Sequence, residues 1–210
     1  MSLTDTTSSA TPSTANAHLR PQPGEYAPNY HRYISLVHPE VQPEVHPDEA
    51  HPNQVQANEA PNNDILATFE EQRRQTLLLL CGRSEAEGDL RYAPDKWTLK
   101  EVLGHLNDTE RIMSYRALRI ARGDQTPIEG FEQDDYVRNA PFARRPLADL
   151  IEDYIAVRRA TISLFRNLDD AAWIRRGVAN KNEISVRALA YIIAGHELHH
   201  RRMLEEKYLK

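Results

Sequence analysis

The sequence predicts an all-α protein, a four-helix bundle that follows a long, largely irregular N-terminal extension. Two observations support this fold class. In the C-terminal two thirds of the 210 residues, apolar side chains recur at three- and four-residue steps in four separate segments. No stretch alternates between apolar and polar residues for long enough to predict a convincing sheet. The length fits one domain with an appendage, which we place at 65–210 and 1–64.

The N-terminal extension, residues 1–64, differs sharply from the rest in composition. It holds nine of the 13 prolines and two basic residues against eight acidic ones. A segment so poor in large apolar residues cannot offset its ordering entropy, so we expect it to be partly disordered. Residues 26–37 are the exception, because their tyrosines and aliphatic residues are dense enough to dock on the bundle. Residues 38–63 contain His-Pro pairs and predict an extended spacer rather than a loose metal site.

The first two helices have clear end signals. The first is expected from Asp64, a natural N-cap, to Gly82, a natural stop. The second begins at Thr98, which forms a capping box with Glu101 three residues later. It should end at Gly123, and a polar connection of about twenty residues should follow it.

The third and fourth helices complete the bundle. The third is expected to start near Pro146, an allowed first-turn proline. The fourth should start at Ser185 as N-cap and run nearly to the end of the chain. Four amphipathic helices of this length bury a core most simply as a four-helix bundle.

The most informative motif lies on the expected fourth helix. His196 and His200 are one turn apart and lie beside its apolar stripe, so both imidazoles can face one ion. The same string matches H-E-x-x-H, in which Glu197 would act as general base. In the metalloprotease families that share this motif, the third metal ligand lies downstream of it. Here only ten residues follow His200, and none of them is a histidine. A third ligand must therefore come from upstream.

One histidine of the helical region, His105, can complete a triad. It lies at the edge of the inward face of the expected second helix. With His196 and His200 it would hold one ion and leave a fourth position open. The alternative is that these are hydrogen-bonded core histidines. That interpretation is favoured for His199, which could also serve in place of His200.

Three segments resemble the DinB/YfiT-like superfamily: residues 92–98, 101–106 and 195–200. The resemblance covers essentially all of 65–210, and residues 38–63 look like an insertion relative to it. It implies a four-helix bundle in which His105, His196 and His200 bind a divalent metal, zinc or nickel by preference.

The resemblance also implies a choice of activities. Members include transferases that use low-molecular-weight thiols and others described as hydrolases. We expect a metal-dependent S-transferase that uses a thiol such as bacillithiol. The alternatives are a hydrolase with a metal-bound water and a non-enzymatic, metal-stabilised stress protein. Candidate catalytic residues are Glu197, Asp134 and Tyr136, although Glu197 should point about 100° around the helix from His196.

Composition excludes several other classes. The formal charge of −5 gives no basic footprint for nucleic acid. The longest apolar run, Leu77–Cys81, is far too short to cross a bilayer, so no membrane partner is expected. Cys81 is the single cysteine, which excludes an internal disulfide, and we expect it to pack within the first helix. These features predict a cytoplasmic protein with a small-molecule substrate, and the resemblance is compatible with a homodimer.

Overall fold

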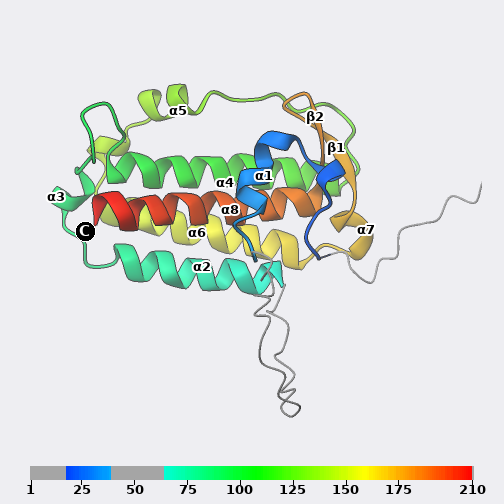
Figure 1. The fold of residues 1–210 in the computed structure, drawn as a ribbon, viewed down its shortest axis with the longest axis horizontal. Helices are drawn as coiled ribbons and strands as arrows, with labels where there is room; N and C mark the ends of the chain where they lie inside the picture. Colours follow the sequence, from blue (N-terminus) through cyan, green and yellow to red (C-terminus); the bar gives the residue numbers. More distant parts are fainter. Residues whose placement is uncertain (1–17, 39–63, 210) are drawn as a thin grey trace, which may run out of the picture.

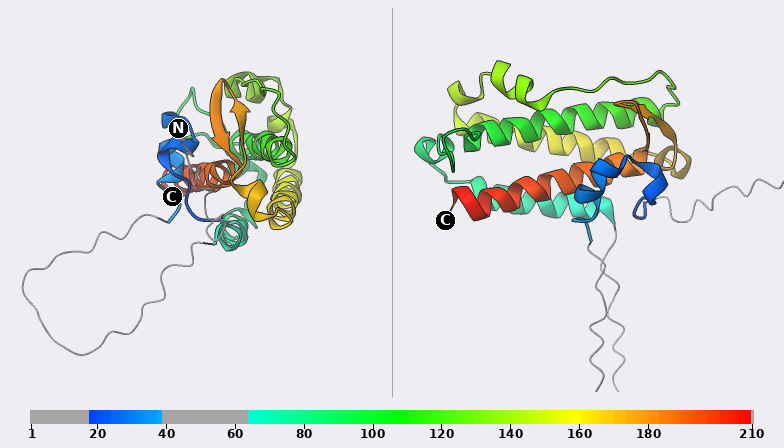
Figure 2. Two further views of the ribbon diagram at one scale, coloured as in Figure 1. Left: turned by 90° about the vertical axis from the view of Figure 1, so that its right-hand side faces the viewer. Right: turned by 45° about the horizontal axis from the view of Figure 1, so that its top comes forward.

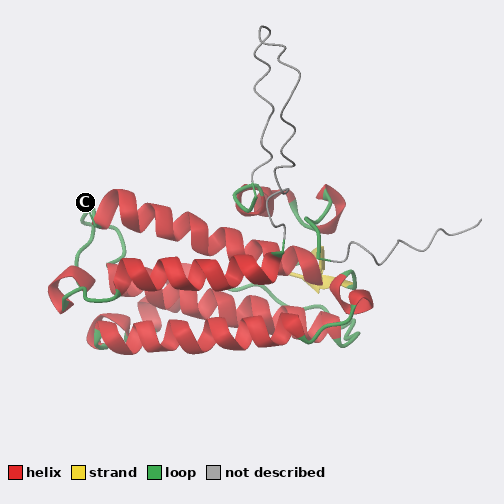
Figure 3. Cartoon of the chain, turned by 90° about the horizontal axis from the view of Figure 1, so that it is seen from below, coloured by secondary structure: helices red, strands yellow, loops and turns green. Residues whose placement is uncertain are grey.

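The computed structural model describes residues 18–38 and 64–209. Its body is a bundle of four long helices, which confirms the predicted fold class (Figures 1 and 3). Helices α4 and α2 each pack against both α6 and α8, and the end-on view in Figure 2 shows the four around a shared core. The bounds of the four helices are α2 Ile65–Leu80, α4 Leu99–Ala121, α6 Leu147–Arg166 and α8 Val186–Met203.

The predicted end signals act largely as expected. Asp64 caps α2 through the amide of Leu66, and Ser185 caps α8. Thr98 and Glu101 form the predicted capping box of α4. Two details differ: Pro146 is the N-cap of α6 rather than its first residue, and α2 ends at Leu80. Cys81 is therefore the exposed C-cap of α2 and does not pack within the helix.

Short elements connect the long helices. They are α3 (Glu85–Gly88), α5 (Gln133–Asn139), η4 (Phe142–Arg144), α7 (Asp170–Trp173), β1 (Arg176–Ala179), β2 (Asn182–Ser185) and the terminal η5 (Leu204–Tyr208). The sequence did not predict the antiparallel β1–β2 hairpin. Its strands have four residues each, too few to show alternation, and its turn places Asn180 and Lys181 at positive φ. Both central residues at positive φ are typical of a two-residue hairpin turn.

The bundle interior consists of two apolar clusters with a polar layer between them. The cluster near the hairpin includes Phe69, Ile120, Phe165, Trp173 and Leu189. The cluster at the opposite end includes Leu80, Leu103, Leu147, Leu150 and Leu204. The buried polar side chains of the middle layer are Gln72, Thr76, His105, Asn107, Thr109, Glu110, Arg158, Thr161, His196, Glu197 and His200.

Residues 18–38 lie along α8, as the blue segment in Figure 2 shows. They include η2 (Pro23–Glu25), η3 (Pro28–Tyr30) and α1 (His31–Ile34), of which α1 packs directly on α8. Tyr26, Ile34 and Val37 are buried in the apolar cluster near the hairpin. Of the expected spacer, 38–63, the residues 39–63 lie outside the described part of the chain, as do residues 1–17 of the extension that we expected to be partly disordered. Within the described parts of the chain, no helix combines the length and apolarity needed to cross a membrane.

A buried ion pair anchors this segment to the start of α8. Glu25 accepts hydrogen bonds from the Ser185 hydroxyl, at 2.7 Å, and from the Arg187 guanidinium. Burial acts to raise the pKa of Glu25, but its hydrogen bonds outweigh burial and hold the pKa below its usual value. The carboxylate therefore stays charged at neutral pH and ties residues 18–38 to the bundle.

Candidate metal centre

Three histidines from two helices converge in the polar layer. His105 comes from α4, and His196 and His200 come from successive turns of α8. One ring nitrogen of each lies within 4.8 Å of the others, and all three side chains are buried. The Nε2 atoms of His105 and His196 are 3.1 Å apart. The structure thus brings together the three residues that the sequence singled out.

The donor set fits a divalent metal. Two imidazoles bound to a tetrahedral zinc at 2.0–2.1 Å would place their nitrogens about 3.3 Å apart, close to the 3.1 Å observed. The Nδ1 atom of His200 is buried without a hydrogen-bond partner. A satisfied core histidine would have used it, so its isolation argues against the purely structural interpretation.

Burial also keeps the three imidazoles neutral. It lowers the pKa of His105 to about 4 and that of His200 to about 3. The pKa of His196 falls well below its usual value because of burial and then of the neighbouring His200. A neutral imidazole keeps a free lone pair, which is the form that a metal requires.

His199 does not join the triad. Its side chain is exposed, and its ring lies edge-on to that of Tyr33, with centroids 5.8 Å apart. The Tyr33 ring also meets His196 edge-on at 5.3 Å. His199 therefore faces the docked α1 segment and is not the core residue that the sequence favoured.

A cleft of about 290 Å³ opens onto two of the three histidines. Its walls come from η3, α1, α4, α8, the connection around α5 and the start of the hairpin turn, and they include His105, Thr109, Arg116, Phe131, Asp134 and His196. The negative charge of Asp134 acts to raise the pKa of His105, against the larger effect of burial. Tyr136 is exposed, is not part of the cleft wall, and rests against Phe131 with ring centroids 5.1 Å apart. Of the candidates in the connection, Asp134 is the one that lines this cleft.

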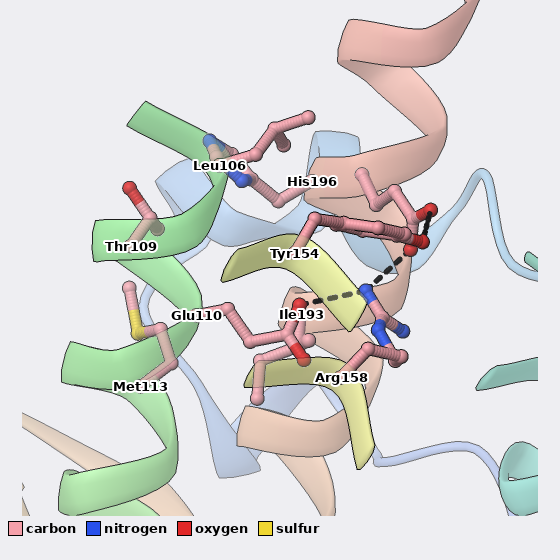
Figure 4. A pocket seen from close by; sticks show the side chains of 9 residues that line it. Leu106, Thr109, Glu110, Met113, Tyr154, Arg158, Ile193 and His196 are labelled. Atoms are coloured by element: carbon pink, nitrogen blue, oxygen red, sulfur yellow. Dashed lines mark hydrogen bonds and ion pairs between the residues drawn. The ribbon is translucent and has the colours of Figure 1, made fainter. Parts of the chain in front are cut away.

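Glu197 occupies a different environment, inside the bundle. Its carboxylate accepts hydrogen bonds from the hydroxyls of Thr76, at 2.6 Å, and Tyr154, at 2.5 Å. It also pairs with Arg158, which donates to Glu110 at 2.8 Å as well. Burial raises the pKa of Glu110. Figure 4 shows the ion pair between Arg158 and Glu110. Both side chains and His196 line a cavity of about 10 Å³. That volume is at the limit for one water molecule.

Sequence reasoning did not identify this buried charge network. A signal was present, because Arg158 lies four residues after Tyr154 and four before Ile162, both expected to face inward. A cation on an apolar face predicts a buried partner of opposite charge. The partners, Glu110 and Glu197, lie on other helices, so the sequence could not indicate which carboxylates they were.

Comparison with known proteins agrees with this architecture. The sequence model of the DinB superfamily matches residues 68–204. A search of curated proteins gave no significant match. Among solved structures, the chain is similar to YfiT from Bacillus subtilis, described as "a probable metal-dependent hydrolase with an unusual four-helix bundle topology". The TM-score is 0.60 at 17% identity, over 74% of this chain and 94% of YfiT.

The family match covers α4, α6, α8, α2 from residue 68 onward and all three clustered histidines. At 17% identity, the similarity to YfiT supports the fold alone. On the family match, this chain belongs to the DinB superfamily.

Proposed function

We propose that this protein is a divalent-metal-dependent hydrolase acting on a small molecule. The observation that carries the proposal is the open side of the triad. Three buried, neutral imidazoles converge on one point, and two of them line a cleft. Structural zinc sites use four protein ligands, whereas catalytic sites keep one position for water or substrate. When bound there, a divalent ion would supply Lewis acidity and lower the pKa of a bound water or thiol.

Asp134 is the best-placed general base for hydrolysis. It lines the cleft with His105 and His196, and its negative charge acts to raise the pKa of His105. We assign it the role of accepting the proton of the attacking water. Glu197 is a poor base, because Thr76, Tyr154 and Arg158 already occupy both of its carboxylate oxygens. The description of YfiT as a probable metal-dependent hydrolase is consistent with this assignment.

A metal-dependent S-transferase that uses a low-molecular-weight thiol is the second candidate. One observation favours it: Asp134 is exposed, and no carboxylate among the described residues is buried against the open side of the triad. A thiol has a lower pKa than water and needs less help from a base. Against it, the cleft of about 290 Å³ is at the small end for pockets that hold a ligand, and a transferase must accommodate both the thiol and its electrophile.

The first experiment is metal analysis of the untagged protein by mass spectrometry. We expect about one zinc or nickel ion per chain, lost in the double variant His196→Ala, His200→Ala and retained in His199→Ala. Equal metal content in all three proteins would contradict the metal centre.

The second experiment separates the two activities. The metal-loaded protein is incubated with an aryl ester alone, and with a thiol plus a halogenated aromatic. Hydrolysis without thiol supports the main proposal, whereas turnover that requires thiol replaces it with the S-transferase. For the hydrolase, Asp134→Asn should lower kcat by about 10² or more with metal content unchanged. Asp135→Asn is the matched control, because Asp135 pairs with Arg138 outside the cleft.

A further inference from the structure

The cleft contains a buried cation that forms no ion pair with any carboxylate of the described residues. Arg116, on α4, lines the cleft, and its side chain is only 2% exposed. One guanidinium nitrogen donates to the carbonyl oxygen of Glu129 at 2.9 Å, and another contacts the sulfur of Met113 at 3.6 Å. Its Nε is buried without a partner. In the described part of the chain, Arg116 forms no ion pair, although a guanidinium has five N–H donors.

The other arginine buried inside the bundle shows how this fold normally compensates such a charge. Arg158 lies between two buried carboxylates, Glu110 and Glu197. On α4 itself, Arg119 is paired with Asp124. An uncompensated buried charge is costly, and it persists where a ligand completes the site. Arg116 is thus distinguished by both its burial and its position in the wall of the cleft.

We infer that the cleft binds an elongated organic anion, whose carboxylate or phosphate group pairs with Arg116 while its other end reaches the histidine triad. This inference rests on the proposed function for what happens at the triad. The planar guanidinium matches an oxyanion with two parallel hydrogen bonds. Arg32, from α1, lines the same cleft and adds a second positive charge, and the two carboxylates that also line it, Glu132 and Asp134, form no ion pair with Arg116.

The spacing along α4 sets the shape of the ligand. His105 and Arg116 are eleven residues apart, about three turns, so they share one face of the helix at roughly 16 Å along its axis. Long side chains on a helix lean toward its N-terminus, which brings the Arg116 guanidinium toward the triad. Thr109 and Met113 lie between them and also line the cleft. A bound molecule must therefore extend over several bonds between its anionic end and its reacting end.

A binding experiment on the metal-free full-length protein tests the anion site by itself, because no metal can then ligate the anion. The probes are suberate and inorganic phosphate, titrated by calorimetry. We expect millimolar or tighter binding of at least one probe, weakened at least tenfold in Arg116→Met. The control Arg122→Met changes an exposed arginine at the end of α4 outside the cleft and should bind like the wild type.

Arg116→Lys provides a second variant if Arg116→Met does not fold. Lysine keeps the positive charge but lacks the planar pair of donors. We therefore expect its affinity for the probe to lie between those of the wild type and Arg116→Met. Absence of binding to wild-type protein, or equal binding by wild type and the Arg116 variants, would overturn the inference.

A kinetic experiment on the metal-loaded protein separates failure of this inference from failure of the proposed function. It compares 4-nitrophenyl acetate with the mono-4-nitrophenyl ester of suberic acid. We expect Arg116→Met to lower kcat/KM at least tenfold for the carboxylate-bearing ester and to leave the neutral ester nearly unchanged. Equal loss on both esters would overturn the anion site and leave the hydrolase standing. Cleavage of neither ester, with Arg116-dependent suberate binding intact, would refute hydrolysis and keep the site.

Discussion

Gly195 is the point where α8 meets the backbone of the docked N-terminal segment. A Cβ at this position would lie 2.0 Å from the carbonyl oxygen of Tyr33 and 2.4 Å from its carbonyl carbon, whereas ordinary contact begins at 3.4 Å. The obstacle is backbone, which cannot rotate away as a side chain can. In Gly195→Ala, α1 must therefore move away from α8 by more than 1 Å, about the difference between 2.0 and 3.4 Å.

Two opposing effects determine the magnitude. Alanine stabilises a helix interior by about 1 kcal/mol relative to glycine, which favours α8. Overpacking costs typically about 1–3 kcal/mol, and displacing α1 also loosens Ile34 and Val37, whose burial contributes about 1.5–3 kcal/mol each. The loss of packing free energy affects residues 31–38, whereas the gain in helix stability affects α8. We expect opening of that segment to become easier by about 3 kcal/mol, roughly a hundredfold in amide protection.

Hydrogen exchange followed by mass spectrometry measures this effect peptide by peptide. Gly24→Ala is the matched control, because its Cβ would meet no atom within 4 Å. We expect faster exchange in 31–38 for Gly195→Ala alone, with protection of α2, α4 and α6 unchanged. Unchanged protection in 31–38, or an equal loss across the whole bundle, would refute the reasoning.

Three further predictions concern the polar layer and the surface. Glu197→Gln should lower the free energy of unfolding by about 3–5 kcal/mol, because it breaks a buried ion pair. The metal content should stay near that of the wild type. A large loss of activity at unchanged stability would instead indicate that Glu197 is catalytic. The pKa values of His105 and His200, about 4 and about 3, lie below their unfolded value near 6.5. The unfolded chain therefore binds more protons than the folded one, so the metal-free protein should lose stability as the pH falls from about 6.5 to 4. Each of the two histidines should lower the free energy of unfolding by up to about 1.4 kcal/mol per pH unit. Urea unfolding at several pH values checks this, and His105→Gln should flatten the slope; equal slopes would contradict it. Because Cys81 is exposed, a thiol reagent should titrate one equivalent per folded chain, and labelling only after denaturation would show that the thiol is covered.

The sequence predicted the bundle because its signals are local. Each long helix carries its own apolar periodicity, and Thr98 with Glu101 marks the start of α4 within four residues. The convergence of His196 and His200 follows from helical spacing alone, and His105 followed because it is the single histidine upstream of them in the helical region. Those observations needed no knowledge of how the helices pack.

The rest depends on contacts between distant parts of the chain. The burial of Glu197 against Arg158 is set by the packing of α6 on its neighbours, which no local pattern encodes. The close packing at Gly195 also depends on a distant partner, because the Tyr33 carbonyl lies 162 residues away in the sequence. The β1–β2 hairpin was missed because strands of four residues are too short for the period-two pattern to emerge.

The charge network of the middle layer has a consequence for the register of the bundle. The two apolar clusters on either side of it could tolerate a helix that slides along its neighbours, since apolar contacts are not directional. The ion pairs of Arg158 prevent such sliding, because one of its guanidinium nitrogens contacts carboxylates on two other helices, Glu110 on α4 and Glu197 on α8. Moving α6 by one turn, 5.4 Å, would strand one buried cation and two buried anions. The ion pairs therefore fix the axial register of α4, α6 and α8 relative to one another. This same register brings His105 within reach of His196.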